Sequence, residues 1–385
     1  MFRNKLHRMR NRFYLIVIST IVVGLGVVSV IAVGLAAAQS NVTGDAGTST
    51  STAGPNDPDC VSTAKLVSTK DLADGGKVYT YSLDGNLIPE PVPPAGWDPL
   101  KASSDEIHQY GLPPRPSDPA ALHDWSAKMS RLKFRGKPFS MCTTRNVSWS
   151  VWHNNLFPWA GGFTINYTTN VNTYYEATGA WYQTAFQSWC GNPSNSGYST
   201  WAGLGGYNDN NGQQRLIQAG TDVSHSSING IYPFYELWNW SHPNPEVMMD
   251  GNVINGGDAV EGWVYYDNSI NGVYAAVIDW DTGWEWSIGP IYWYAYDSAY
   301  DYWDGTTADF VTESPSCGEN CYYYLRRPYL DSTYYYYATA NGQPISDFDS
   351  WQFNERNWKY NGNSLMQASG YDGGHAWSDQ FIGCW

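Results

Sequence analysis

The sequence predicts an all-β protein, a sandwich or a barrel, and three observations support this fold class. The 385 residues include 20 Trp, 30 Tyr and 38 Gly but only 15% charged residues, which suits aromatic-rich sheets better than helices. From about residue 141 to the end, runs such as "AVEGWVYYDN" and "STYYYYATAN" are β-branched or aromatic. Turn signals such as NG, GG, DTG and DG separate these runs at intervals of about 8–12 residues, the spacing of a sandwich or barrel.

The N-terminal segment, residues 1–38, is predicted to direct export. An uncharged run over 13–38 follows the basic residues Arg3, Lys5, Arg8, Arg10 and Arg12. The run ends in three alanines and suits a cleaved signal peptide, but it is also long enough to span a bilayer as a retained anchor. Both alternatives place the rest of the chain outside the cytoplasm, as a secreted or a cell-surface protein. Any contact with a membrane is expected only through such an anchor.

Cysteine count and charge narrow the class of protein further. An even number of cysteines in an exported chain predicts disulfides among Cys60, Cys142, Cys190, Cys317, Cys321 and Cys384. Cys317 and Cys321 in "CGENC" are candidates for a small disulfide loop, which we favour over a metal site because no histidine lies nearby. The net charge of −15 argues against nucleic acid as a partner, because phosphate binding needs clustered Lys and Arg.

Two segments precede the β-rich region. Residues 39–58 are rich in Ser, Thr, Gly and Asn and are predicted to form a flexible linker. Residues 59–140 form a Pro-rich leader with one short predicted helix, for which Pro119 suits the first position. One face of this helix carries Leu122, Trp125, Met129 and Leu132. The leader either carries a small surface helix packed on the main domain, or is a pro-segment or regulatory arm that covers the cleft until acid releases it.

The sequence lacks the motifs of several enzyme classes. It has no HExxH, no GxSxG, no GxxxxGK[ST] and no strand-linked GxGxxG, so we expect no metal and no nucleotide cofactor. Asp309 and Glu313 in "TADFVTES" share one face of a strand but would lie roughly 13 Å apart. This separation is too large for the carboxylate pair of a glycosidase.

Four motifs within residues 141–385 follow the order and spacing of a known family: "STWAGLGGYN", "LIQAGTD", "YPFYELW" and "TADFVTESPS". "PWAGGF" precedes them and "ISDFDSWQFN" follows them. This region resembles the glutamic peptidases (eqolisins), and the leader resembles the segment before this domain in bacterial members. The resemblance implies a sandwich of two curved antiparallel sheets, a concanavalin-like jelly roll, and hydrolysis of peptide bonds in acid without a cofactor. We expect a monomer whose partner is its polypeptide substrate.

The family's functional residues carry over position by position. Gln218 in "LIQAGTD" matches the catalytic glutamine, and Glu313 matches the catalytic glutamate. Residues that match positions in the family's cleft are Trp159, Trp201 and Glu236. Phe234 replaces a cleft tryptophan, Gly205 replaces an aspartate, and Pro315 replaces an apolar residue. Because the dyad is retained, these departures bear on substrate range more than on chemistry.

The dyad has a physical rationale. Glu313 in its ionised form can act as general base on a water and then as general acid towards the leaving amine. A glutamine amide is neutral at every pH, so an N–H of Gln218 can stabilise the oxyanion even in acid. Asp309, as a nearby hydrogen-bond partner, and Asp222 are expected to support the site.

Each site residue also has a structural alternative. Gln218 can be a satisfied buried amide, and Glu236 can simply link neighbouring strands. Trp159 and Trp201 can belong to the core. The functional alternatives to a peptidase are a non-catalytic β-sandwich that binds carbohydrate or protein through its aromatic side chains, and a structural cell-surface protein. Gln218 and Glu313 converging within reach of one water would favour the peptidase, whereas a separation of more than about 6 Å on different faces would favour the binding module.

Overall fold

The computed structural model describes the following parts of the chain: 60–117, 119–143, 156–157, 159–165, 174–184, 188–189, 198–205, 215–223, 231–239, 246–249, 254–292, 307–313, 328–329, 332–345, 350–353, 355–357, 363–368 and 377–381. The expected export segment 1–38, the linker 39–58 and the pair Cys317 and Cys321 lie outside these residues, as does Pro315. Within the described ranges, no helix is long and apolar enough to cross a membrane.

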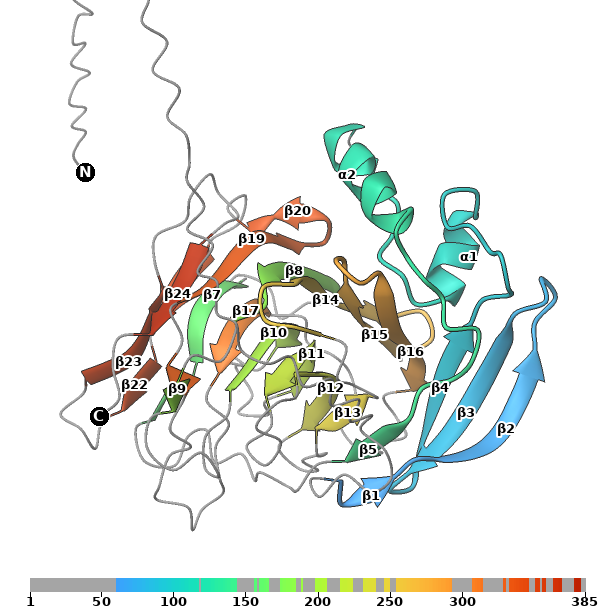
Figure 1. Cartoon of the computed structure of the whole chain (residues 1–385), viewed down its shortest axis with the longest axis horizontal. Coiled ribbons are helices and arrows are strands. Elements are labelled where there is room, and N and C mark those ends of the chain that lie inside the picture. The colour runs from blue at the N-terminus through green and yellow to red at the C-terminus, as the bar shows by residue number, and fades with distance from the viewer. Residues whose placement is uncertain are drawn as a thin grey trace, which may run out of the picture. The chain divides into compact units, whose positions relative to one another are not determined.

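Two antiparallel sheets form a sandwich, which confirms the predicted all-β fold (Figure 1). The first sheet has the order β1 (Ser62–Thr63), β5 (Met141–Thr143), β13 (Val247–Met249), β12 (Tyr232–Asn239), β11 (Arg215–Val223), β10 (Tyr198–Gly205), β17 (Thr307–Glu313), β7 (Trp159–Ile165) and β21 (Ser350–Phe353). The jelly-roll connectivity stays a prediction.

The second sheet has the order β16 (Trp284–Tyr292), β15 (Gly272–Asp279), β14 (Ala259–Asp267), β8 (Glu176–Tyr182), β19 (Ser332–Ala340), β24 (Trp377–Phe381), β23 (Asn363–Ala368), β22 (Glu355–Asn357) and β6 (Leu156–Phe157). β20 (Gln343–Pro344) pairs with β19. β9 (Ser188–Trp189) and β18 (Pro328–Tyr329) pair with each other in a separate two-stranded sheet.

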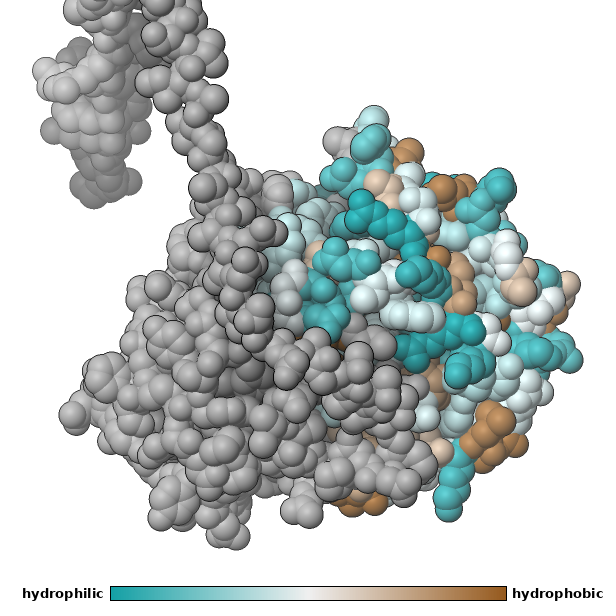
Figure 2. Space-filling model, viewed as in Figure 1, coloured by the Kyte–Doolittle hydropathy of each residue, from teal (hydrophilic) through white to brown (hydrophobic). Residues whose placement is uncertain are grey.

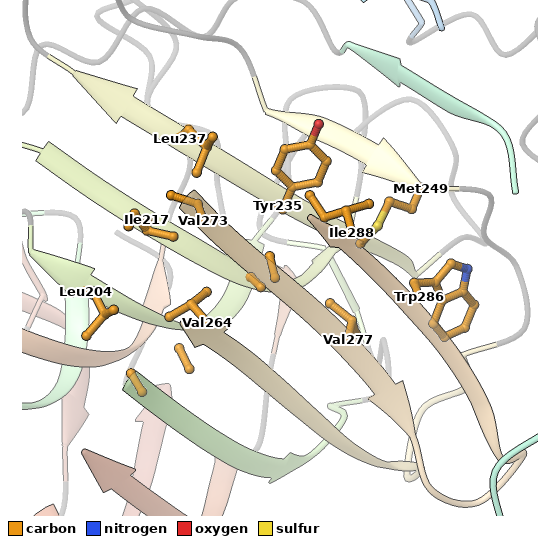
Figure 3. Packing of buried hydrophobic residues seen from close by; sticks show 14 of the residues in the cluster. Leu204, Ile217, Tyr235, Leu237, Met249, Val264, Val273, Val277, Trp286 and Ile288 are labelled. Carbon is orange, nitrogen blue, oxygen red and sulfur yellow. The ribbon is translucent and has the colours of Figure 1, made fainter. Parts of the chain in front are cut away.

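The main hydrophobic core lies between the facing sides of the two large sheets (Figure 3). Ile217 of β11 and Leu204 of β10 meet Val264 of β14 in one cluster of buried side chains. Full burial of each such side chain stabilises the fold by about 1.5–3 kcal/mol. The Tyr335 hydroxyl of β19 donates to the main-chain oxygen of Val311 in β17 at 2.7 Å, and this hydrogen bond links the two sheets.

The leader contains two helices, α1 (Ser104–Gln109) and α2 (Pro119–Met129), and a three-stranded sheet of β2 (Lys65–Asp71), β3 (Lys77–Leu83) and β4 (Asn86–Val92). α2 begins at Pro119, as predicted. Its predicted apolar face is confirmed, because Trp125 and Met129 are buried against Ile278 and Trp280 of the domain. Leu122 packs against the same cluster, whereas Leu132, predicted on the same helical face, lies beyond the end of the helix at Met129 and packs against the cluster from the following segment.

The sequence analysis missed α1 and the leader's sheet, although both have local signals. α1 starts with a capping box, in which the Ser103 hydroxyl accepts from the Glu106 main chain and the Glu106 carboxylate accepts from the Ser103 main chain at 2.7 Å. β3 and β4 are joined at Asp84 and Gly85, which have φ values of +50° and +89°. A turn with two positive φ angles is the tight hairpin turn that an Asp-Gly pair favours.

The leader is attached to both large sheets. β1 pairs with β5 at the edge of the first sheet, and a disulfide joins Cys60 to Cys142 there. The helices lie beside β14–β16 (Figure 1), where the Lys128 ammonium contacts the Glu261 carboxylate at 2.6 Å. On the described surface, hydrophilic and hydrophobic residues are interspersed (Figure 2). The described contacts of the leader thus lie at the edge of the first sheet and on the second.

Candidate active site

The candidate site lies on the face of the first sheet that points away from the core. In the pairing of β10, Gly203 is opposite Gln218 on one side and Asp309 on the other, while Ser199 is opposite Glu313. Directly paired residues share a face, and even spacing along a strand preserves it, so Gln218 and Glu313 are on the same face. The alternate residues of these strands fill the core, among them Ala202, Ile217, Ala219, Ala308 and Phe310.

Gln218 is buried but only partly satisfied. Its Nε2 donates to Oε2 of Glu236, its pair in β12, whereas its Oε1 has no hydrogen-bond partner among the described residues. Gln183, equally buried, uses both ends of its amide. Nε2 of Gln183 donates to the Tyr198 hydroxyl at 3.0 Å, and its Oε1 accepts from the Thr221 hydroxyl at 2.6 Å. Gln183 is therefore a structural amide, whereas the Oε1 of Gln218 on the site face has no hydrogen-bond partner among the described residues.

An indole orients the carboxyl group of Glu313. Trp201 Nε1 donates to Glu313 Oε2 at 2.9 Å, and both side chains are fully buried. The indole lies over Gly203, where an added Cβ would be only 2.9 Å from ring atom Cζ3. Because Gly203 has no side chain, the ring can lie along β10 and still reach Glu313.

A second carboxyl group of β17, that of Asp309, is also fully buried on this face. Its Oδ2 accepts from the Thr307 hydroxyl at 3.0 Å, and its Oδ1 has no partner among the described residues. Burial raises the pKa of Asp309 well above its ordinary value. Asp309 is therefore uncharged in acid. The register places Asp309, rather than Glu313, directly across Gly203 from Gln218.

The remaining predicted residues take several positions. Asp222 is buried opposite Ser199, and Phe234 is buried opposite Gly220 on the site face. Trp159 of β7 pairs through its main chain with Glu313 of β17, and the side chain of Trp159 lies outside the described part of the chain. Gly205 ends β10 with a φ of +81°, a conformation that favours glycine over the family's aspartate.

The sequence analysis missed Glu246, which directly precedes β13. Burial raises the pKa of Glu246 well above its ordinary value, and the carboxyl groups of Asp222, Glu236 and Glu313 raise it further. The Glu246 carboxyl group therefore interacts with acidic groups from three strands of the first sheet. A local sequence signal for this does not exist, because the residues meet only through the pairing of distant strands.

Comparisons with known proteins add no assignment. No model of a known protein family matches the chain, and no curated protein shows significant similarity to it. Within the described part of the chain, no group of three or more His, Cys, Asp or Glu side chains is arranged to hold a metal ion.

Proposed function

We propose that this protein is a secreted, acid-active endopeptidase that uses Gln218 and Glu313 as its catalytic dyad. The observation that carries the proposal is the partly satisfied amide of Gln218, buried on the same sheet face as the indole-bound carboxyl group of Glu313. The disulfide between Cys60 and Cys142 suits an extracellular protein. The four motifs that resemble glutamic peptidases support the same function.

In the proposed reaction, Glu313 removes a proton from a water, whose oxygen attacks the peptide carbonyl carbon. The carbonyl π electrons move to the oxygen, and the second amide hydrogen of Gln218 stabilises the resulting oxyanion. Glu313 then returns the proton to the amide nitrogen, the C–N bond breaks, and an acid and an amine leave. The Trp201 N–H holds the Glu313 carboxyl group in place through both steps.

The test is hydrolysis of a denatured protein substrate between about pH 2 and 7, with wild type and Glu313→Gln. We expect acid-side turnover in the wild type and a loss of about 10²–10⁴-fold in the variant, because general acid–base catalysis is removed. Glu176→Gln is a matched control: Glu176 is also buried and accepts an indole N–H, from Trp263 at 2.9 Å, but lies in the second sheet. Unchanged turnover in Glu313→Gln would contradict the proposal.

Carbohydrate binding is the second candidate function, and one observation favours it. Tyr182 and Tyr334 are exposed in the second sheet, with parallel rings 6.3 Å apart and the Tyr336 ring 4.9 Å from Tyr182. Exposed aromatic faces are suited to stacking on sugar rings. Calorimetric titration with soluble oligosaccharides tests this function, with Tyr182→Ala expected to weaken binding while peptide hydrolysis is unaffected. Absence of binding by the wild type would contradict it.

A further inference from the structure

Glu246 belongs to a row of polar side chains that crosses three strands. β12 and β13 pair Tyr235 with Val247, so the next step of this register places Glu246 opposite Glu236. Glu236 is in turn paired with Gln218 of β11. Facing residues on antiparallel strands have Cβ atoms about 4.5–5.5 Å apart. This extension of the register puts Glu246 beside Glu236, in agreement with the electrostatic interaction between the two carboxyl groups.

The environment of the Glu246 carboxyl group is enclosed and acidic. Its Oε1 is buried and has no hydrogen-bond partner among the described residues. The groups that act on its charge are the carboxyls of Asp222 in β11, Glu236 in β12 and Glu313 in β17, and no described lysine, arginine or histidine is among them. Burial and repulsion by the three neighbouring carboxyl groups both raise the pKa of Glu246, which favours retention of its proton.

We propose that Glu246 is a positioning residue that holds one proton between itself and Glu236, so that Glu236 remains an acceptor for the Gln218 amide. This inference rests on the proposed function, because the amide that is positioned is the proposed oxyanion donor. The register of β11, β12 and β13 and the hydrogen bond from Gln218 Nε2 to Glu236 carry it.

A single carboxyl neighbour can hold a glutamine amide in two orientations. Glu236 as an acceptor binds Nε2 and leaves the second N–H of Gln218 for the oxyanion. Glu236 with its own proton can instead donate to Oε1, which turns the N–H groups away. The second arrangement becomes more favourable in acid, where the proposed reaction runs. When the proton resides on Glu246 and is donated to Glu236, Glu236 has no proton of its own and cannot donate to Gln218 Oε1.

The same pair sets an upper pH limit for activity. When the shared proton is lost, two facing carboxylates repel each other beside the carboxyls of Asp222 and Glu313. Glu246→Gln retains an N–H donor to Glu236 but does not titrate. We expect the alkaline limb of kcat/KM to move up by about one pH unit or more in this variant. Glu246→Leu, which has no donor, should lose about 10- to 100-fold in kcat with little change in KM.

Glu176→Gln again provides the control, because it removes a buried, indole-bound carboxyl group from the other sheet. It should leave kcat and the alkaline limb unchanged. An active wild type with the same alkaline limb as Glu246→Gln would overturn the inference.

A second measurement does not depend on turnover. Titration of ¹³C-labelled glutamate carboxyl carbons by NMR should show that Glu246→Gln removes one resonance and changes the titration of the resonance that Glu236→Gln assigns to Glu236. If the titrations of Glu236 and Glu246 are coupled but the protein has no peptidase activity, the proposed function is refuted, and with it the role of the pair in catalysis. The sharing of a proton between the two residues would still be supported. A Glu236 titration that is identical in wild type and Glu246→Gln would refute the pair whatever the turnover.

Discussion

At the scale of single residues, two buried glutamines have the same side chain but differ in their hydrogen bonds. Among the described residues, Gln183 has partners at both ends of its amide, whereas Gln218 has one, Glu236. The sequence identified Gln218 as an unusual polar residue in a strand, but its partner follows from the register of β11 with β12. Pairing between strands is non-local, so no local pattern near Gln218 could have shown that Glu236 is its partner, and Glu246 was not selected at all.

The two glutamines should respond differently to truncation. We expect Gln218→Ala to lower kcat by about 10²–10³-fold, because an oxyanion donor is lost. Its free energy of unfolding should fall by less than that of Gln183→Ala, because among the described residues only Glu236 loses a hydrogen bond. Gln183→Ala should cost about 1–3 kcal/mol, because buried partners lose their bonds. Urea denaturation and turnover measure both. A fully active Gln218→Ala would contradict its proposed role.

At the scale of elements, strand β10 shows how a glycine shapes the site. Its Trp201 and Gly203 are two residues apart on one face, and the indole of the first lies over the second. Sequence reasoning selected Trp201 as a cleft or a core residue and passed over Gly203. The need for glycine becomes visible only when the direction of the indole is known.

Gly203→Ala should displace the indole. The new Cβ would lie 2.9 Å from Trp201 Cζ3 and from the Ile217 main-chain oxygen. We expect a loss of about 1–3 kcal/mol in stability, as for other overpacked sites, and reduced turnover because Glu313 loses its indole donor. Gly272→Ala, whose Cβ would meet the flexible end of Ile270 at 2.9 Å, is the control and should retain turnover. Equal turnover in both variants would contradict this role for Gly203.

The elements of the leader differ in how well the sequence predicted them. The start of helix α2 and its buried face up to Met129 were predicted correctly because their signals, Pro119 and an apolar stripe, are local. Helix α1 was missed although the capping box of Ser103 and Glu106 is also local, because the helix is only six residues long and has little periodicity. The position of both helices on the second sheet depends on contacts such as Lys128 with Glu261, 133 residues apart. Sequence patterns do not encode such contacts.

At the scale of the whole molecule, the leader contributes to the stability of the fold. It adds β1 to the first sheet, it covers Ile278 and Trp280, and its disulfide closes a loop between residues 82 positions apart. Removing a native disulfide typically costs about 2–5 kcal/mol. These contacts favour the packed layer over the releasable pro-segment among the two alternatives.

Removal of residues 60–140 should therefore destabilise the protein rather than activate it. We expect the truncated chain to unfold at a lower temperature than the full chain and to be less active at every pH. Cys60→Ser combined with Cys142→Ser should show a smaller loss of the same sign, since only the cross-link is removed. Thermal unfolding and acid-side hydrolysis measure the effect. A truncated chain that is folded and more active than the full chain would support the pro-segment.

The protein should become less stable as the pH rises from about 4 to 8. Burial raises the pKa of Glu285 to about 7, although Ser287 and the leader's Arg135 oppose the shift. A carboxyl group with a raised pKa binds its proton more tightly in the folded state. Its contribution to stability is complete below the unfolded pKa of about 4.3 and is lost as the pH rises through 7. For Glu285 this loss amounts to at most about 4 kcal/mol.

Glu285→Gln should therefore flatten the dependence of the free energy of unfolding on pH between about 4.5 and 7, as measured by urea denaturation. Glu106→Gln is the control. Hydrogen bonds from the Ser103 main chain and side chain lower the pKa of Glu106, so its contribution is lost only as the pH falls. This control should keep the wild-type slope in that range. A slope that is the same in Glu285→Gln as in the wild type would show that Glu285 keeps no extra proton in the fold.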